Sequence, residues 1–268
     1  MDLSSLLAWI DADLKIDGLR RGATRHLVVH GYTTVASTTF SGVWEPTGIV
    51  SYPSRAGQQL ELVSASASDD GVNPSASAYV HVVRVHHLEA PDLEYAYEDV
   101  TINGLTSVNT DSSLIARILS LQAIKYGVNE RAAGRISCRH TVNTPTYDAI
   151  PAGAIGSASC RTTVPARFRA YCWRWSVASK LAETAIYQLV DTADDRPSPS
   201  EPPQRVPQVR DTALSSDGRA ATMELTSPRR LMPGDDVEVQ AMRSGAADVL
   251  ATARIDLVLV ETGEEYVG

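Results

Sequence analysis

Histidine side chains are the first candidates for chemistry in this sequence. Four of the six His (His30, His81, His86 and His87) lie in segments rich in β-branched residues. Successive residues of a strand point to opposite faces, so the adjacent His86 and His87 could not easily share one metal ion. We interpret these residues as surface or hydrogen-bonded polar groups, and we expect no metal site and no cofactor.

Paired carboxylates form the second candidate group. They occur at Asp69-Asp70, Asp194-Asp195 and Asp235-Asp236, each close to Gly or Pro. Asp hydrogen-bonds its own backbone in turns, so turn chemistry explains all three pairs. The segment 69–73 lacks the alternating acids and closing Glu of a calcium loop. Because the chain also has no nucleophile elbow, phosphate loop or dinucleotide fingerprint, we expect a protein without catalytic residues.

Aromatic side chains recur at Tyr171, Trp173 and Trp175. In a strand, this spacing predicts that all three rings share one face. The favoured interpretation is packing within the sheet. The alternative is a platform that stacks sugars, as in a carbohydrate-binding or carbohydrate-hydrolysing β-sandwich, and it requires exposed rings.

The first residues predict a short amphipathic helix within an N-terminal arm, residues 1–26. Apolar side chains follow a helical spacing at Leu3, Leu6, Leu7, Ile10 and Leu14, and Gly18 is a suitable end. Such a helix either folds back on its own domain or docks on another protein. These five side chains are therefore the candidate partner-binding residues.

From residue 27 to 268 the pattern changes to short β-prone runs separated by turns, which predicts an all-β, jelly-roll-like β-sandwich. It is either one domain or two subdomains, about 27–148 and 149–268. Alternation slips near Val82 and Val83, which indicates a bulge. Asn103-Gly104 predicts a hairpin that places Ile102 opposite Leu105. A second hairpin is expected between the strands on either side of Gly245. The segment 114–126 fits either a helix or a strand.

A long loop is expected at 191–208, because Pro cannot donate to a ladder and Ser, Asp and Glu favour turns. It contains Pro197, Pro199, Pro202 and Pro203 as candidate inter-subunit residues. The loop is either exposed or lies across a neighbouring subunit.

Net charge and apolar patterning exclude two classes of partner, nucleic acids and membranes. A net charge of −8 and a pI near 5.2 argue against direct nucleic-acid binding. The chain has no apolar run of membrane-spanning length and no signal-peptide pattern, so we expect a soluble protein made in the cytoplasm without membrane contact. The three Cys form no disulfide or zinc pattern, and we interpret them as small buried or half-buried residues.

Four ordered groups of segments resemble structural proteins in the particles of tailed bacteriophages. They are residues 42–46 with 52–53, 60–70 with 78–82, 98–110 with 134–136, and 150–153 with 233–239 and 258–261. The resemblance covers most of residues 42–261, and the third group is the most specific. Residues 73–75 and the loop at 191–208 depart from the family.

This resemblance implies a β-strand at 114–126 and a non-enzymatic virion protein synthesised in the host cytoplasm. The expected role is a capsid decoration or cement protein that binds the major capsid protein or another virion protein. Self-association as a symmetric oligomer, with a homotrimer favoured, is part of the same expectation. The alternative is a structural component of the tail, baseplate or fibre.

Overall fold

The computed structural model describes residues 3–16, 21–46, 48, 50–142, 145–180, 184–192, 208–215 and 219–262. Their fold is all-β with one short helix, α1 (Leu3–Ile16), as the sequence predicts. The chain forms two units: unit 1 comprises residues 1–30, 34–43 and 160–268, and unit 2 comprises 31–33 and 44–159. Residues 1–30 and 34–43 belong to the same unit as residues 160–268, because most of the first strand packs with the C-terminal part of the chain.

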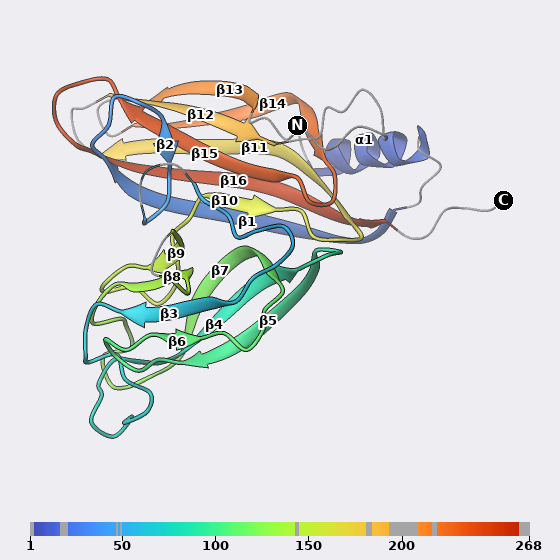
Figure 1. Cartoon of the computed structure of the whole chain (residues 1–268). Coiled ribbons are helices and arrows are strands. Elements are labelled where there is room, and N and C mark those ends of the chain that lie inside the picture. The colour runs from blue at the N-terminus through green and yellow to red at the C-terminus, as the bar shows by residue number, and fades with distance from the viewer. Residues whose placement is uncertain are drawn as a thin grey trace. The chain divides into compact units, whose positions relative to one another are not determined.

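Unit 1 is a β-sandwich of two sheets (Figure 1). One sheet has the order β1-β16-β11-β14, and the other has the order β10-β15-β12-β13 with β2 also paired to β15. The strand bounds are β1 (Arg21–Val35), β2 (Ser41–Gly42), β10 (Arg161–Thr163), β11 (Phe168–Lys180), β12 (Ala185–Asp191), β13 (Gln208–Ser215), β14 (Ala220–Leu231), β15 (Asp236–Arg243) and β16 (Val249–Thr262).

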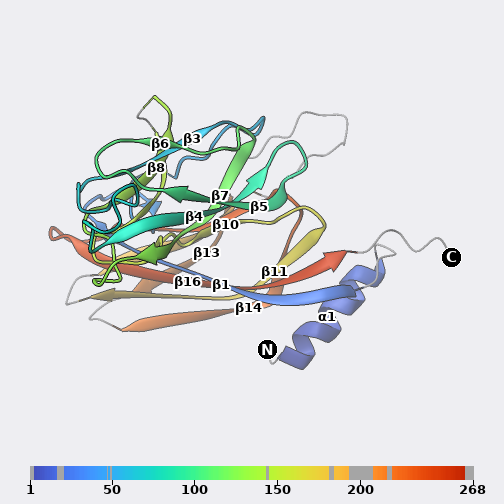
Figure 2. The same ribbon diagram turned by 90° about the horizontal axis from the view of Figure 1, so that it is seen from below.

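The core of unit 1 lies between these sheets. Alternate residues of β16, including Ile255, Leu257 and Leu259, meet Val237 and Val239 of β15. This alternation follows from the two-residue period of a strand. The outer face of the first sheet is covered in part by α1, whose apolar residues cluster with residues of β11 and β16 (Figure 2). The helix is therefore part of the packing of unit 1.

Unit 2 is a second, smaller β-sandwich. Its sheets have the orders β6-β3-β8-β9 and β5-β4-β7. The strands are β3 (Leu60–Ser64), β4 (Val80–Glu89), β5 (Glu94–Thr101), β6 (Val108–Asn109), β7 (Ile115–Tyr126), β8 (Ile136–His140) and β9 (Thr146–Ile150). Apolar residues of both sheets, such as Leu62, Val85 and Leu121, form its core.

Two local features of unit 2 follow the sequence predictions. The pairing of β4 with β7 shifts register at Val82 and Val83, so the predicted bulge is confirmed. Residues 115–126 form the strand β7 rather than a helix. Register shifts let a strand stay buried on one face although its apolar alternation slips.

The predicted hairpin at Asn103-Gly104 is wrong in its pairing. Asn103 pairs with Thr106, so Gly104, at φ +54°, and Leu105 occupy the turn. Ile102 is fully buried while Leu105 is 64% exposed, so the two do not share an apolar face. The chain then enters β6, which pairs with β3 in the other sheet. Asn-Gly identified a turn but not the partner of the next strand.

The predicted final hairpin is also wrong. β15 pairs with β10, β12 and β2, whereas β16 pairs with β11 in the opposite sheet. The connection around Gly245 therefore crosses the sandwich. Alternating strands of this kind have the same sequence pattern in either sheet, so the pattern does not select a partner.

Asp69 shows that turn chemistry does not explain every acid pair. Its buried carboxylate accepts hydrogen bonds from Ser64 Oγ (2.6 Å) and from the backbone N–H groups of Val80 (3.2 Å), Ala133 (2.9 Å) and Gly134 (3.0 Å). Its neighbour Asp70 does form a turn. Asp69 instead joins β3, the start of β4 and the segment before β8.

The remaining expectations concern cysteines and membrane spans. Cys138, Cys160 and Cys172 are all buried, which confirms their interpretation as small buried residues. Burial raises the pKa of the Cys172 thiol to about 12. The one helix in the described part of the chain is not long and apolar enough to cross a membrane.

Candidate functional site

The outer face of the sheet β5-β4-β7 carries an exposed group of aromatic and charged side chains. In β4, Val83 and Val85 point into the core, so the alternate residues Arg84 and His86 point outward. The pairing with β5 places Asp99 opposite Arg84 and Tyr97 opposite His86. The pairs Arg84–Asp99 and His86–Tyr97 thus lie side by side on the solvent face of the sheet.

Arg84 fixes two of these side chains. It donates from Nε to Asp99 Oδ1 at 2.7 Å and from Nη2 to Oδ2 at 2.9 Å, and its guanidinium lies 4.4 Å from the centre of the Tyr97 ring. The hydrogen bond lowers the pKa of Asp99 and raises that of Arg84. A bidentate pair combined with a cation–π contact restrains Tyr97.

His86 fixes the second tyrosine. Its Nδ1 lies 2.7 Å from Tyr95 Oη, and the two rings stack with centres 6.1 Å apart. Burial, together with nearby Arg84, lowers the pKa of His86. Tyr95 and Tyr97 nevertheless remain 51% and 55% exposed. We call Arg84, His86, Tyr95, Tyr97 and Asp99 the Tyr/Arg face.

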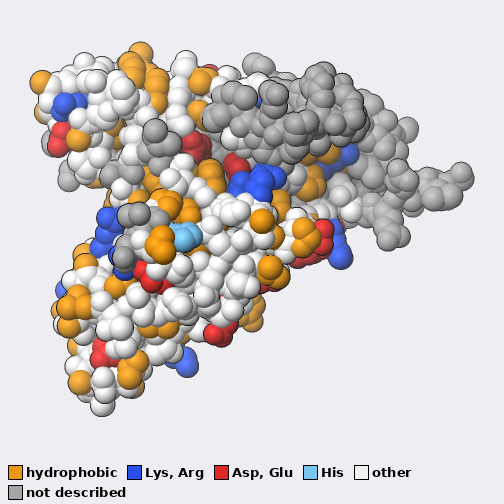
Figure 3. All heavy atoms as spheres, in the orientation of Figure 1, with side chains coloured by type: hydrophobic (Ala, Val, Ile, Leu, Met, Phe, Trp, Pro, Cys, Tyr) orange, Lys and Arg blue, Asp and Glu red, His pale blue; other side chains and the backbone are white. Residues whose placement is uncertain are grey.

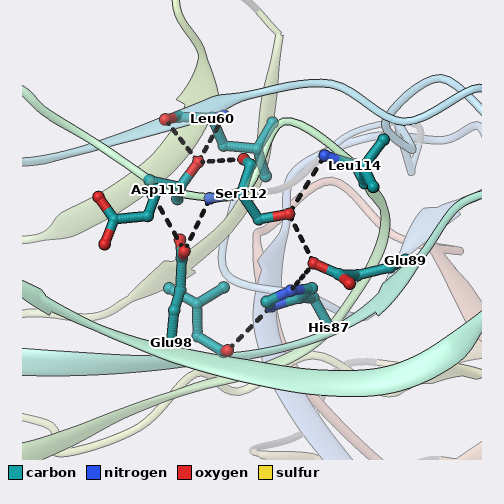
Figure 4. Close-up of polar contacts among 9 residues, drawn as sticks. Leu60, His87, Glu89, Glu98, Asp111, Ser112 and Leu114 are labelled. Carbon is teal, nitrogen blue, oxygen red and sulfur yellow. Dashed lines mark hydrogen bonds and ion pairs between the residues drawn. The ribbon is translucent and has the colours of Figure 1, made fainter.

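A polar network holds the loop that follows β6 to the other side of the same sheet (Figure 4). Ser112 Oγ donates to Glu89 Oε1 at 2.6 Å, and the same oxygen lies 3.4 Å from His87 Nε2. Glu98 Oε2 accepts the backbone N–H groups of Asp111 and Ser112, both at 3.0 Å. The network therefore fixes strands β4 and β5 relative to this loop.

The order of groups in this network does not match an activated serine. In a catalytic triad the hydroxyl donates to the imidazole, which then accepts its proton. Here the carboxylate of Glu89 lies between Ser112 and His87, and the hydrogen bond from Ser112 lowers the pKa of Glu89. A carboxylate with a lowered pKa is a weaker base. The geometry thus favours a structural role for Ser112.

The predicted partner-binding helix packs on its own unit. Leu6, Ile10 and Leu14 are buried in a cluster with Tyr171 and Val258. Asp13 adds a hydrogen bond, because its Oδ2 accepts from Tyr171 Oη at 2.9 Å. Leu7 is only partly buried in this cluster, and the side chain of Leu3 lies outside the described residues. Of the two alternatives for this helix, the structure shows the one in which it folds back on its own domain, with Leu6, Ile10 and Leu14 at an internal site.

The predicted aromatic stripe is wrong because β11 contains an irregularity between Cys172 and Arg174. One extra residue reverses the alternation, so Tyr171 and Trp173 face α1 whereas Trp175 enters the sandwich core. Tyr171 and Trp175 are fully buried. These rings do not form an exposed sugar platform, which removes the basis for the carbohydrate alternative.

The other predicted residues divide into described and undescribed ones. Pro197, Pro199, Pro202 and Pro203, together with Asp194 and Asp195, lie outside the described residues. Asp70 forms the predicted turn by accepting the N–H groups of Val72 and Asn73. Within the described ranges, no group of three or more His, Cys, Asp or Glu is placed to hold a metal ion.

Sequence reasoning missed the Tyr/Arg face. The signal was present as two alternating sets, Arg84 and His86 in one strand and Tyr95, Tyr97 and Asp99 in the next. Their relevance depends on the register of β4 with β5, which alternation alone does not supply.

Comparisons with known proteins do not identify a family. The chain matches no protein-family model and no curated protein sequence. Solved structures that align with it include T=1 particles derived from infectious bursal virus, at 11% identity over 93% of this chain and 80% of that chain, with a TM-score of 0.15.

Two further structures come from infectious bursal disease virus. The VP2 subviral particle aligns at 12% identity over 94% of this chain and 84% of that chain, with a TM-score of 0.16. The Gx strain structure aligns at 11% identity over 92% and 73%, with a TM-score of 0.19. Scores this low carry no argument about fold or function.

Proposed function

We propose that this chain is a non-enzymatic structural protein of a virus particle, and specifically a decoration or cement protein of a tailed bacteriophage. The observation that supports binding is the Tyr/Arg face. Exposed Tyr and Arg side chains are the types enriched at the energetic centres of protein interfaces. The ordered sequence segments that resemble structural proteins of tailed bacteriophages support a phage particle as the place where the chain acts.

The preorganisation of this face favours protein recognition. Arg84 and His86 restrain Tyr97 and Tyr95, so less side-chain entropy is lost when a partner packs against the rings. Charged side chains of both signs are interspersed with uncharged ones on the surface seen in Figure 3, which is typical of a surface that avoids unspecific contacts. The proposed partners are the major capsid protein and further copies of this chain, arranged as a homotrimer.

Cryo-electron microscopy of particles from cells that produce this chain, combined with antibody labelling, tests the proposal. Density on the head shell at local three-fold positions is the expected result. Density in the tail, baseplate or fibre would overturn the cement assignment in favour of the alternative role. Particles that lack the chain would overturn the whole proposal. Native mass spectrometry of the purified protein tests the trimer independently.

A further inference from the structure

Strand β5 forms an open edge of its sheet. The sheet order is β5-β4-β7, so β5 pairs with β4 on one side only within the described residues. The eight residues from Glu94 to Thr101 pair with β4 without a register shift. A regular edge of this length is a template for another strand unless something blocks it.

The register identifies the backbone groups on the open side. The N–H of Ile102 donates to the carbonyl of His81 at 2.9 Å, which extends the same register as the pairing of Val83 with Val100. Hydrogen-bonded pairs alternate along an antiparallel ladder. The N–H and C=O groups of Tyr95, Tyr97 and Asp99 therefore point away from β4.

The edge carries an excess of negative charge. Strand β5 contains three acids, Glu94, Glu98 and Asp99, and no Lys or Arg, and the residue opposite Asp99 on β4 is Arg84. Arg84 is already engaged by Asp99. A strand that adds to this edge is therefore favoured if it carries positive charge.

Glu98 supplies a specific point of attraction. Its Oε2 accepts two backbone N–H groups, but its Oε1 is buried and has no hydrogen-bond partner among the described residues. A guanidinium or ammonium group on the inward side of an added strand would lie near this carboxylate and be attracted by its charge. On the outward side, the same strand would meet Tyr95 and Tyr97, whose ring faces attract cations.

We propose that β5 binds an extended, Arg- or Lys-bearing segment of a partner protein, which adds to the sheet as a fourth strand. This inference rests on the proposed function and names the binding mode of its partner. Charge also argues against a second copy of β5 as the occupant, because pairing two such edges would bring their acids together. Backbone hydrogen bonds to Tyr95, Tyr97 and Asp99 supply affinity, and the acids select the sequence.

A peptide titration of the full chain tests strand addition. The probe is a blocked nine-residue peptide in which Arg and Val alternate, and the control peptide has Glu in place of Arg. Two further versions of the Arg peptide carry N-methyl groups on alternate residues: in one version they block one edge of the peptide strand, and in the other version they block the opposite edge. Nuclear magnetic resonance follows the amide shifts and hydrogen exchange of Tyr95, Tyr97 and Asp99.

The Arg peptide should bind and protect these three amides, whereas the Glu peptide should not bind. Of the two N-methylated peptides, only the one whose methyl groups lie on the edge that pairs with β5 should fail to bind. Tyr97→Ala should weaken binding at least about tenfold, because Tyr is among the residue types that form energetic hot spots of interfaces. Glu98→Gln should weaken it by a smaller factor. Tyr126→Ala is the matched control, because Tyr126 is an exposed tyrosine on β7, the opposite edge strand, and should leave affinity unchanged.

Several results would overturn the inference. They are equal binding of the Arg and Glu peptides, binding insensitive to N-methylation of either edge, or equal effects of Tyr97→Ala and Tyr126→Ala. Amide spectra that overlay with the wild type establish that each variant is folded. Because particle location is measured separately, a chain found in particles whose β5 takes up no peptide overturns strand addition while leaving the proposed function in place.

Discussion

Replacing Asp69 with Asn should destabilise unit 2 far more than the same replacement at Asp70. Each oxygen of the Asp69 carboxylate accepts two hydrogen bonds: Oδ1 from Val80 and Ala133, and Oδ2 from Ser64 and Gly134. An amide has only one acceptor oxygen. Its NH₂ group must therefore face one of these two pairs of donors.

The less costly orientation places the NH₂ group toward Ser64 and Gly134, because a hydroxyl can rotate and accept. The N–H of Gly134 is then buried without a partner, which costs about 1–3 kcal/mol, and the remaining bonds lose their charge assistance. Relief of burying a charge offsets part of this loss. We expect a net destabilisation of about 3 kcal/mol, which lowers the Tm of a unit of this size by roughly 10 °C.

Differential scanning calorimetry measures this change, and hydrogen-exchange mass spectrometry assigns it to unit 2. Asp70 is the matched control, since its carboxylate accepts N–H groups in a turn in which Val72 and Asn73 are exposed. Asp70→Asn should leave the transition close to that of the wild type. The reasoning is refuted if the two variants have the same Tm, or if the destabilisation appears in peptides from unit 1.

Three further predictions concern unit 1 and the thiols. Ile10→Ala should destabilise unit 1 by about 2–5 kcal/mol in urea unfolding, as for other buried large-to-small changes, and no loss would contradict packing of α1 on its own sheet. The buried thiols, including Cys172 with its raised pKa, should react with a thiol reagent at pH 8 only after unfolding, and rapid native labelling would contradict their burial. Burial raises the pKa of Glu238, so the free energy of unfolding falls as the pH rises above the ordinary Glu range and the buried carboxyl group ionises. Glu238→Gln should remove this pH dependence and stabilise the protein at pH 7, which unfolding curves recorded at several pH values measure.

The sequence predicted those elements whose signal is local. The helical spacing of Leu6, Ile10 and Leu14 predicted α1, and apolar runs predicted most strands. It also predicted the bulge in β4, because the apolar alternation slips there. In β11 the irregularity remained hidden, since aromatic side chains at 171, 173 and 175 suit either face of a sheet.

Pairing was harder to predict because it depends on residues far apart in the chain. Asn103-Gly104 predicted a turn, but the following strand joins β3, some 45 residues earlier, instead of β5. The Tyr/Arg face was missed for the same reason, because it depends on the pairing of two strands. Tyr97 becomes part of a restrained surface only because β4 brings Arg84 to it, and no spacing within β5 reveals that contact.

The acids of β5 also bear on how this edge avoids pairing with itself. Charged side chains protect edge strands from edge-to-edge association, and Glu94 and Glu98 lie on a regular edge in which the described residues include neither a register shift nor a proline. A double variant, Glu94→Gln with Glu98→Gln, should therefore self-associate beyond the wild-type oligomer in sedimentation velocity runs while binding the Arg peptide more weakly. Tyr97→Ala should weaken peptide binding without added self-association. If the double variant keeps the wild-type sedimentation profile, the charges on β5 serve partner selection alone, and another feature must keep the edges apart.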